Sequence, residues 1–187
     1  MDELQGKLEA GEQLLWSSHP ESFETLDKTY KKPIITKIVI AVVIAVALLV
    51  EYIILAGKNN AGIKPAVIII IAVCGGYFCL DPFLQAKQLK KRLYAVTDKR
   101  LLCVSSDEIK SVSYDNIPAA CLKKDEDGHV TLLCGEDALK AKPNKWRSIA
   151  LHPLTAVDSK ACESFAFYAM PDAGRVKKLL KEYLTLL

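Results

Sequence analysis

Residues 34–56 read IITKIVIAVVIAVALLVEYIILA and residues 66–84 read AVIIIIAVCGGYFCLDPFL, and these two apolar stretches decide the fold of the chain. Each is long enough, at about 1.5 Å per helical residue, to cross a hydrocarbon core of about 30 Å. Only the short loop 57–65 separates them, and hydrophobic residues make up 51% of the 187-residue chain. The pattern therefore predicts two transmembrane helices joined as a hairpin.

The hairpin divides the rest of the chain into a short leader and a longer soluble region. Residues 1–33 are too few to enclose a core of their own, whereas the region after the hairpin suffices for one small domain. A basic connector is expected at 85–91 and the domain itself at 92–187. Within the leader, the segment 11–20 (GEQLLWSSHP) is expected to be extended and to dock beside the domain.

The charges around the hairpin predict its orientation. The loop 57–65 carries only two lysines, whereas positive residues flank the other ends of both spans: Lys28, Lys31 and Lys32 before the first, and Lys87, Lys90, Lys91 and Arg92 after the second. Because Lys and Arg accumulate on the cytoplasmic side, we expect a two-span protein of the inner or plasma membrane with both termini in the cytoplasm. The four residues after the second span are expected to contact the membrane surface, where each contributes about 1 kcal/mol of attraction to anionic lipid.

The six cysteines indicate a reducing compartment. They include no Cys-x-x-Cys pair, and none stands near a His at the spacing of a metal site. Several occupy apolar positions in strand-like segments, which is typical of reduced thiols buried in a cytosolic domain. The sequence therefore predicts no metal and no cofactor.

Alternating apolar and polar residues after the connector predict seven short antiparallel strands, at 92–97, 100–105, 109–114, 119–124, 129–134, 147–152 and 164–170. The acidic string 125–128 (DEDG) is typical of a hairpin turn between the fourth and fifth. A final helix is expected because five apolar residues share the spacing of one buried face: Val176, Leu179, Leu180, Tyr183 and Leu184. The predicted fold is a membrane helical hairpin plus an α+β domain, a small β-barrel or sandwich capped by a C-terminal amphipathic helix.

Two motifs resemble those of bacterial pleckstrin-homology-like domains attached to membrane hairpins. The stretch 94–102 (YAVTDKRLL) is similar to the opening hairpin of that family, with Tyr94, Thr97, Asp98 and Arg100 at the matching positions. The leader segment 11–20 resembles the family's pre-membrane motif, a Gly-Glu followed by apolar residues and a His or Pro. The resemblance implies a pleckstrin-homology-like fold at a membrane, more than an activity. The acidic turn and a Lys-rich loop at 140–145 depart from the family, so the strand order of the middle region stays open.

Polar residues within the apolar stretches are candidates for function, because burying them in lipid is costly. Glu51 lies near the outer end of the first span and Asp81 near the inner end of the second. We expect them at different depths, where they serve either as interfacial anchors or in helix pairing or transport. Gly75 and Gly76 permit close helix packing or oligomerisation, although glycine is also simply tolerated in spanning helices.

The sequence carries no enzymatic signature. His-Glu-x-x-His, Gly-x-Ser-x-Gly and glycine-rich phosphate-binding motifs do not occur, and the three histidines are isolated from one another. The strand pattern allows Cys121 and His129 to face each other across the fourth and fifth strands, but a reactive pair would also need an electropositive, partly open setting. Nucleic-acid binding is also disfavoured, because the net charge is only +3 and acidic residues are interspersed throughout.

We therefore predict a membrane-anchored binding or scaffold module without catalytic activity. Its partners are membrane lipids and either a protein recruited to the inner membrane face or a second copy of the chain. A sheet edge or the groove beside the C-terminal helix is the natural contact. Two alternatives stay open, a small subunit associated with a transporter or channel and a module that senses anionic lipid.

Overall fold

The computed structural model describes residues 4, 6–59, 62–105, 109–135, 138 and 164–187. The chain forms two compact units. One comprises Met1–Phe23 together with Lys87–Leu187, and the other is Glu24–Ala86. The leader up to Phe23 therefore belongs to the same unit as the region after the hairpin, whereas the sequence pattern separates them into different segments.

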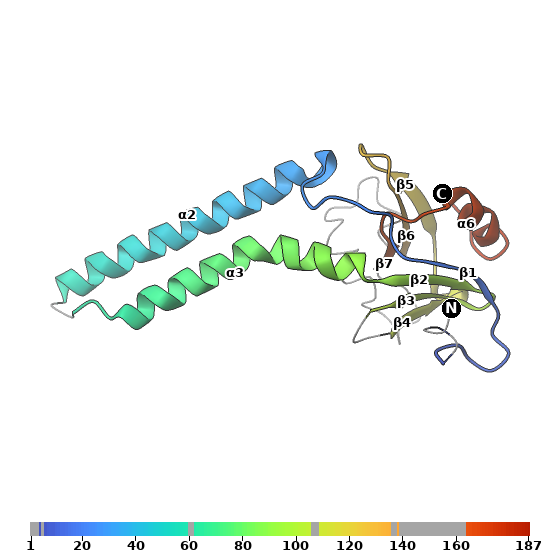
Figure 1. Cartoon of the computed structure of the whole chain (residues 1–187), viewed down its shortest axis with the longest axis horizontal. Coiled ribbons are helices and arrows are strands. Elements are labelled where there is room, and N and C mark those ends of the chain that lie inside the picture. Colours follow the sequence, from blue (N-terminus) through green and yellow to red (C-terminus); the bar gives the residue numbers. More distant parts are fainter. Residues whose placement is uncertain (1–3, 5, 60–61, 106–108, 136–137, 139–163) are drawn as a thin grey trace. The chain divides into compact units, whose positions relative to one another are not determined.

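The second unit is a helical hairpin (Figure 1). Helix α2 runs Lys28–Lys58 and helix α3 runs Pro65–Lys90, and both are long and apolar enough to cross a membrane. Pro65 is the first residue of α3, where its missing N–H has no helical partner to lose. Since α3 continues to Lys90, the expected basic connector is a helical extension of the second span.

One strand of the leader belongs to a four-stranded antiparallel sheet. Its strands are β1 (Leu14–Ser18), β2 (Leu93–Thr97), β3 (Arg100–Val104) and β4 (Ile109–Ser113), hydrogen-bonded in the order β1-β2-β3-β4 (Figure 1). The leader segment expected to dock beside the domain is thus an edge strand of its first sheet. This sheet brings together residues that lie on either side of the hairpin in the sequence.

A second antiparallel sheet has three described strands, β5 (Ala120–Lys124), β6 (Val130–Gly135) and β7 (Ser164–Phe167), in the order β5-β6-β7. The short 3-10 helix η1 (Tyr114–Asn116) comes between β4 and β5. The predicted hairpin turn joins β5 to β6, with Gly128 at φ +93° and the Asp125 carboxylate accepting the N–H groups of Asp127 and His129. The strand expected at 147–152 lies outside the described residues.

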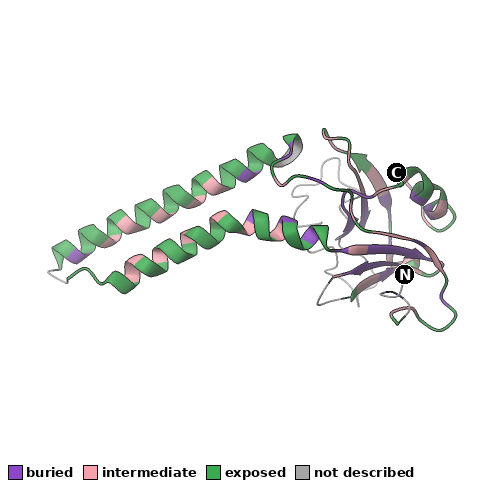
Figure 2. Cartoon of the chain, viewed as in Figure 1, coloured by how far each residue is buried: buried purple, intermediate pink, exposed green. Residues whose placement is uncertain are grey.

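The two sheets do not close into a barrel, so that part of the prediction is wrong. They are separate hydrogen-bonded sheets that share one buried core (Figure 2). The core joins Trp16 and Tyr94 of the first sheet, Leu132 and Phe167 of the second, and Val176 of the last helix. A sheet closes into a barrel only when its edge strands pair, and the described strands here form two open sheets.

The C-terminal helix α6 (Ala173–Leu180) covers part of this core. Val176 and Leu180 are buried, as the apolar spacing predicts. The helix is shorter than expected, so that Tyr183 and Leu184 lie in the turns that follow it. Tyr183 nevertheless stacks on Tyr114, with 4.8 Å between ring centroids.

Candidate functional site

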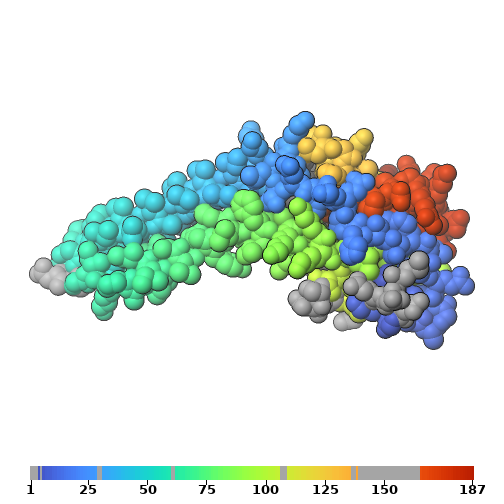
Figure 3. Space-filling model, viewed as in Figure 1, coloured from blue at the N-terminus to red at the C-terminus, as the bar shows by residue number. Residues whose placement is uncertain are grey.

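Strand β1 joins the leader to the first strand after the hairpin. It runs antiparallel to β2, with Leu14 opposite Thr97 and Ser18 opposite Tyr94, and the register shifts between Leu14 and Trp16. The Trp16 ring is buried in the core, 6.4 Å from the ring of Phe167. In the space-filling view the leader, in blue, lies against the C-terminal segment, in red (Figure 3). The hairpin is therefore an insertion between two neighbouring strands of one sheet.

The Glu12 carboxylate anchors the start of this strand. Arg100 donates from Nε to Oε1 and from Nη2 to Oε2, each at 2.9 Å, in a two-pronged ion pair. Thr97 donates to Oε1 at 2.7 Å, and the backbone N–H of Glu9 donates to Oε2 at 2.7 Å. The Glu12 side chain is fully buried, whereas that of Arg100 is 18% exposed. A buried carboxylate is tolerated here because both of its oxygens receive hydrogen bonds.

These contacts set the protonation state of Glu12. Burial opposes the charged form and raises its pKa, but hydrogen bonds from Arg100, the Glu9 backbone and Thr97 outweigh it. The pKa of Glu12 therefore falls to about 2 from an ordinary value of 4.5. In turn, the hydrogen bond to the Glu12 carboxylate raises the pKa of Arg100. At neutral pH Glu12 and Arg100 therefore form an ion pair.

The turn between β2 and β3 adds further ties to the leader. Asp98 accepts the backbone N–H of Gln13 at 2.9 Å and donates its own N–H to the Gln13 carbonyl at 3.1 Å. The Thr97 hydroxyl also accepts the N–H groups of Lys99 and Arg100, which fixes the turn. Thr97, Asp98 and Arg100, three of the four residues that carry the resemblance to the opening hairpin, thus bond the leader segment directly before β1.

The fourth, Tyr94, lies in the core of the same unit. Its ring stacks on Phe167 with 4.5 Å between centroids, and its buried hydroxyl accepts the N–H of Tyr168 at 3.2 Å. Burial raises the pKa of Tyr94. Tyr94 therefore links β2 of the first sheet to the end of β7 in the second.

Sequence reasoning placed Glu12 in a motif but gave it no partner. Arg100 lies 88 positions away in the chain, so no local pattern could have paired the two. The signal available in the sequence was a Gly-Glu pair ahead of a short apolar segment. In the structure Gly11 directly precedes the buried Glu12 and has φ +74°. At the other end of β1, the His19 Nδ1 lies 2.8 Å from the Arg92 carbonyl oxygen and forms a hydrogen bond with it.

The four residues predicted to contact the membrane surface differ in their exposure and in their contacts. Lys87 and Lys91 are exposed, and Lys90 lies over the Phe23 ring with 5.1 Å between Nζ and the centroid. Arg92 is only 8% exposed, because it leads into β2 within the folded domain. Arg92 is therefore a buried residue of the domain, which the basic run in the sequence did not indicate.

Asp81 is paired within the hairpin. Lys37 approaches its Oδ2 at 2.5 Å, and the Gln85 amide donates to its Oδ1 at 2.8 Å. Its partner Lys37 lies 44 positions earlier in the chain, and the sequence pattern did not predict this pair. This cluster ties α2 to α3 at the end of the hairpin remote from the loop.

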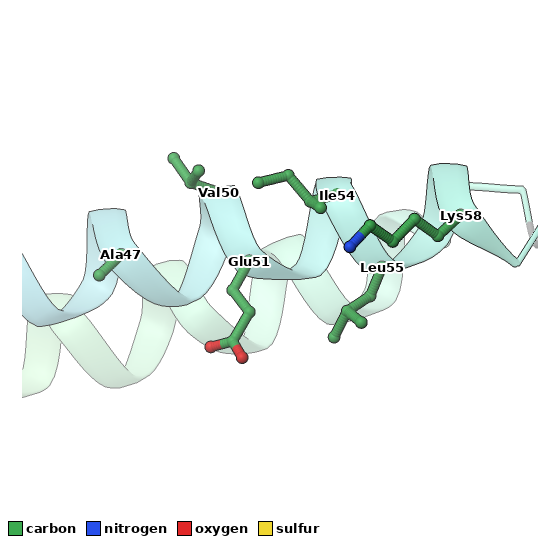
Figure 4. Close-up of a pocket in the computed structure, with 6 residues that line it drawn as sticks. All are labelled: Ala47, Val50, Glu51, Ile54, Leu55 and Lys58. Carbon is green, nitrogen blue, oxygen red and sulfur yellow. The ribbon is translucent and has the colours of Figure 1, made fainter.

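Glu51 lies apart from that cluster, on the exposed surface of α2. It lines a shallow apolar depression with Ala47, Val50 and Ile54, and Lys58 lies two turns further along the same helix (Figure 4). Glu51 and Asp81 therefore do not form a carboxylate pair in the described hairpin. Near the loop, the Tyr52 hydroxyl of α2 accepts the N–H of Lys64, the residue before α3, at 2.7 Å.

The two adjacent glycines of α3 have different surroundings. A Cβ added at Gly75 would lie 3.1 Å from the Cβ of Ala45, so α2 and α3 approach closely there. A Cβ added at Gly76 would meet nothing within 4 Å. Gly75 is thus the residue that packs within the hairpin, and Gly76 lies on its outer surface.

Cys121 and His129 do not face each other. Cys121 lies opposite Leu133, and burial raises the pKa of its thiol, which is the reverse of activation. His129 instead contacts the Glu21 carboxylate, with 3.3 Å between Nδ1 and Oε2. Across the described part of the chain, no three His, Cys, Asp or Glu residues converge as a metal site would require.

Comparisons of the chain with protein-family models, with curated proteins and with solved structures find no match.

Proposed function

We propose that this chain is a two-span integral membrane protein whose pleckstrin-homology-like domain recruits a protein partner to the inner membrane face, without catalysis. One observation carries the proposal. The hairpin leaves the domain after β1 and returns into the adjacent strand β2. Hydrogen-bonded strands must lie on the same side of a membrane, so the insertion requires an even number of crossings, which two spans provide.

The short connection between α3 and β2 supports the hairpin as the membrane anchor of the domain. Lys91 and Arg92 are the two residues between the end of α3 and the start of β2. A connection of two residues is shorter than a flexible linker, which supports an anchoring role for the hairpin. The lysines on this side of the hairpin favour the cytoplasm, which supports a domain at the inner face.

An edge of the second sheet supports the binding role. The last residues of the chain form a single parallel bridge with the first residue of β5, in which Leu187 donates its N–H to the Ala120 carbonyl at 2.8 Å. This edge therefore already accepts extended backbone. Further along the same strand, Lys123 and Lys124 are exposed. A partner peptide would extend or replace the tail by strand addition.

Site-directed cross-linking in native membranes tests the partner. A photoreactive residue at Lys123 is expected to capture a protein, whereas the matched control at Lys178, exposed on α6, is not. Leu187→Pro removes the N–H that bonds β5 and should raise the yield at Lys123. Capture of only a second copy of the chain, or equal capture at both positions, would contradict recruitment through β5.

Topology is tested separately with reporter fusions in the loop 57–65 and after Leu187. We expect an external loop and a cytoplasmic C-terminus. An external C-terminus would refute the anchor as proposed, whatever the cross-linking shows.

A further inference from the structure

The hairpin contains a groove between its two helices, and anchoring the domain does not require such a groove. The groove has a volume of about 530 Å³ and lies between α2 and α3. Its walls are apolar side chains, Ile40, Ile44 and Leu48 from one helix and Ile71 and Phe78 from the other. Its one charged lining residue among those described is Lys37.

The length of the groove matches one leaflet. From Lys37 to Leu48 the helix advances eleven residues, or about 16 Å, which is about half of a 30 Å hydrocarbon core. A groove of this length with a charge at one end suits a single lipid, with its acyl chain along the wall and its headgroup at Lys37. If the domain is cytoplasmic, that lipid belongs to the inner leaflet.

The charges at the mouth select among headgroups. Lys37 is 49% exposed and pairs with Asp81, whose side chain is 19% exposed, so the mouth presents one cation and one anion. A phosphate complements the three donors of the lysine ammonium, and a primary ammonium complements the remaining lone pairs of the carboxylate. A purely anionic headgroup would leave Asp81 facing a like charge, and a quaternary ammonium has no N–H to donate.

We propose that the hairpin binds one phospholipid with a primary-amine headgroup, its phosphate on Lys37, its ammonium on Asp81 and an acyl chain along the groove. This inference rests on the proposed membrane insertion, since it requires the hairpin to lie in a bilayer. The lipid would fill the space between the spans and stabilise their packing. It adds a specific ligand to an anchor that would otherwise contact lipid without preference.

Native mass spectrometry of the full chain in mild detergent tests the site with three added lipids: phosphatidylethanolamine, phosphatidylglycerol and phosphatidylcholine of the same acyl composition. One phosphatidylethanolamine is expected to remain bound after the others dissociate. Asp81→Asn should lower that preference about tenfold or more, which corresponds to losing one charge-assisted hydrogen bond. Retention of phosphatidylglycerol or phosphatidylcholine as tightly as phosphatidylethanolamine would overturn the headgroup assignment.

A second pair of variants tests the location. Ala41→Phe places a ring in the groove, whereas Ala72→Phe adds the same ring at an exposed position of α3. Only A41F should lose the bound lipid, and equal loss in A72F would overturn the placement. Extraction of the membranes with alkaline carbonate comes first. A chain that is extracted refutes the membrane anchor itself, whereas a retained chain that binds no lipid refutes only this inference.

Discussion

Replacing Glu12 with Gln removes one charge while keeping the shape of the side chain, so it isolates the electrostatic part of the contact with Arg100. The Glu12 side chain is fully buried, and its pKa is about 2 in the folded chain against an ordinary value of 4.5. Each pKa unit corresponds to about 1.4 kcal/mol, so the charged carboxylate contributes on the order of 3 kcal/mol to folding at neutral pH. E12Q should lose a stability of that order.

The loss should depend on pH in a defined direction. Because the pKa of Glu12 is lower in the folded than in the unfolded chain, its contribution is present above about pH 4.5 and is lost as the pH falls through about 2. Below that pH the acid is protonated in both states, and it resembles the neutral Gln. The stability difference between the wild type and E12Q should therefore be largest near pH 7 and shrink toward pH 2.

Urea unfolding of the full chain in mild detergent provides the assay. Trp16 is buried on β1, so its fluorescence reports release of the leader strand once Trp146 is replaced by Phe in every chain compared. Glu9→Gln is the matched control. Glu9 also contacts Arg100, at 2.9 Å, but is 62% exposed, and an exposed ion pair contributes less than about 1 kcal/mol.

Two results would refute this reasoning. The first is that E12Q is no less stable than E9Q at pH 7. The second is that the stability lost in E12Q stays constant as the solution is acidified. The first would mean that the buried pair does not hold the leader strand. The second would mean that the deficit comes from altered packing and not from the lost charge.

Three further perturbations follow from the same structure. Gly75→Leu should destabilise the hairpin by about 1–3 kcal/mol through overpacking against Ala45, whereas Gly76→Leu should be nearly neutral. Thermal unfolding in detergent compares the two variants. Equal effects would contradict the close approach of the helices at Gly75. Tyr94→Phe removes the hydroxyl that accepts the N–H of Tyr168. It should lower the urea midpoint by the equivalent of about 1 kcal/mol, and an unchanged midpoint would contradict a stabilising role for that bond. Because burial raises the pKa of the Cys121 thiol, this thiol should react slowly with iodoacetamide at neutral pH and continue to gain reactivity above pH 9. Peptide-resolved labelling measures the rate, and a plateau of reactivity below pH 8 would contradict this expectation.

Local patterns predicted the elements well where neighbours in the sequence decide the structure. The two apolar stretches form α2 and α3, and five of the six strands described after the hairpin lie within the predicted ranges. The sixth, β6, runs one residue past its predicted end, to Gly135. The acidic turn before Gly128 also forms as expected, because its side chains bond their own backbone.

Contacts between distant segments could not be predicted in this way. Trp16 and Glu12 belong to a leader segment too short to fold alone, and their partners lie beyond the hairpin. Arg92 reads as one more cation in a basic run, and only the folded domain buries it. The closed barrel was wrong for a related reason, since strand patterns specify which face is buried but not which edges pair.

The sequence by itself determined that this protein has two long apolar helices, short strands after them and an amphipathic end, because hydrophobic periodicity is a local property. Only the tertiary structure decided that the leader is a strand of the domain and that the hairpin is an insertion within one sheet. That result depends on hydrogen bonds between β1 and β2 and on an ion pair spanning 88 positions. Such contacts leave no periodic signal in the chain, since each side of the pair is compatible with many partners until folding brings one within reach.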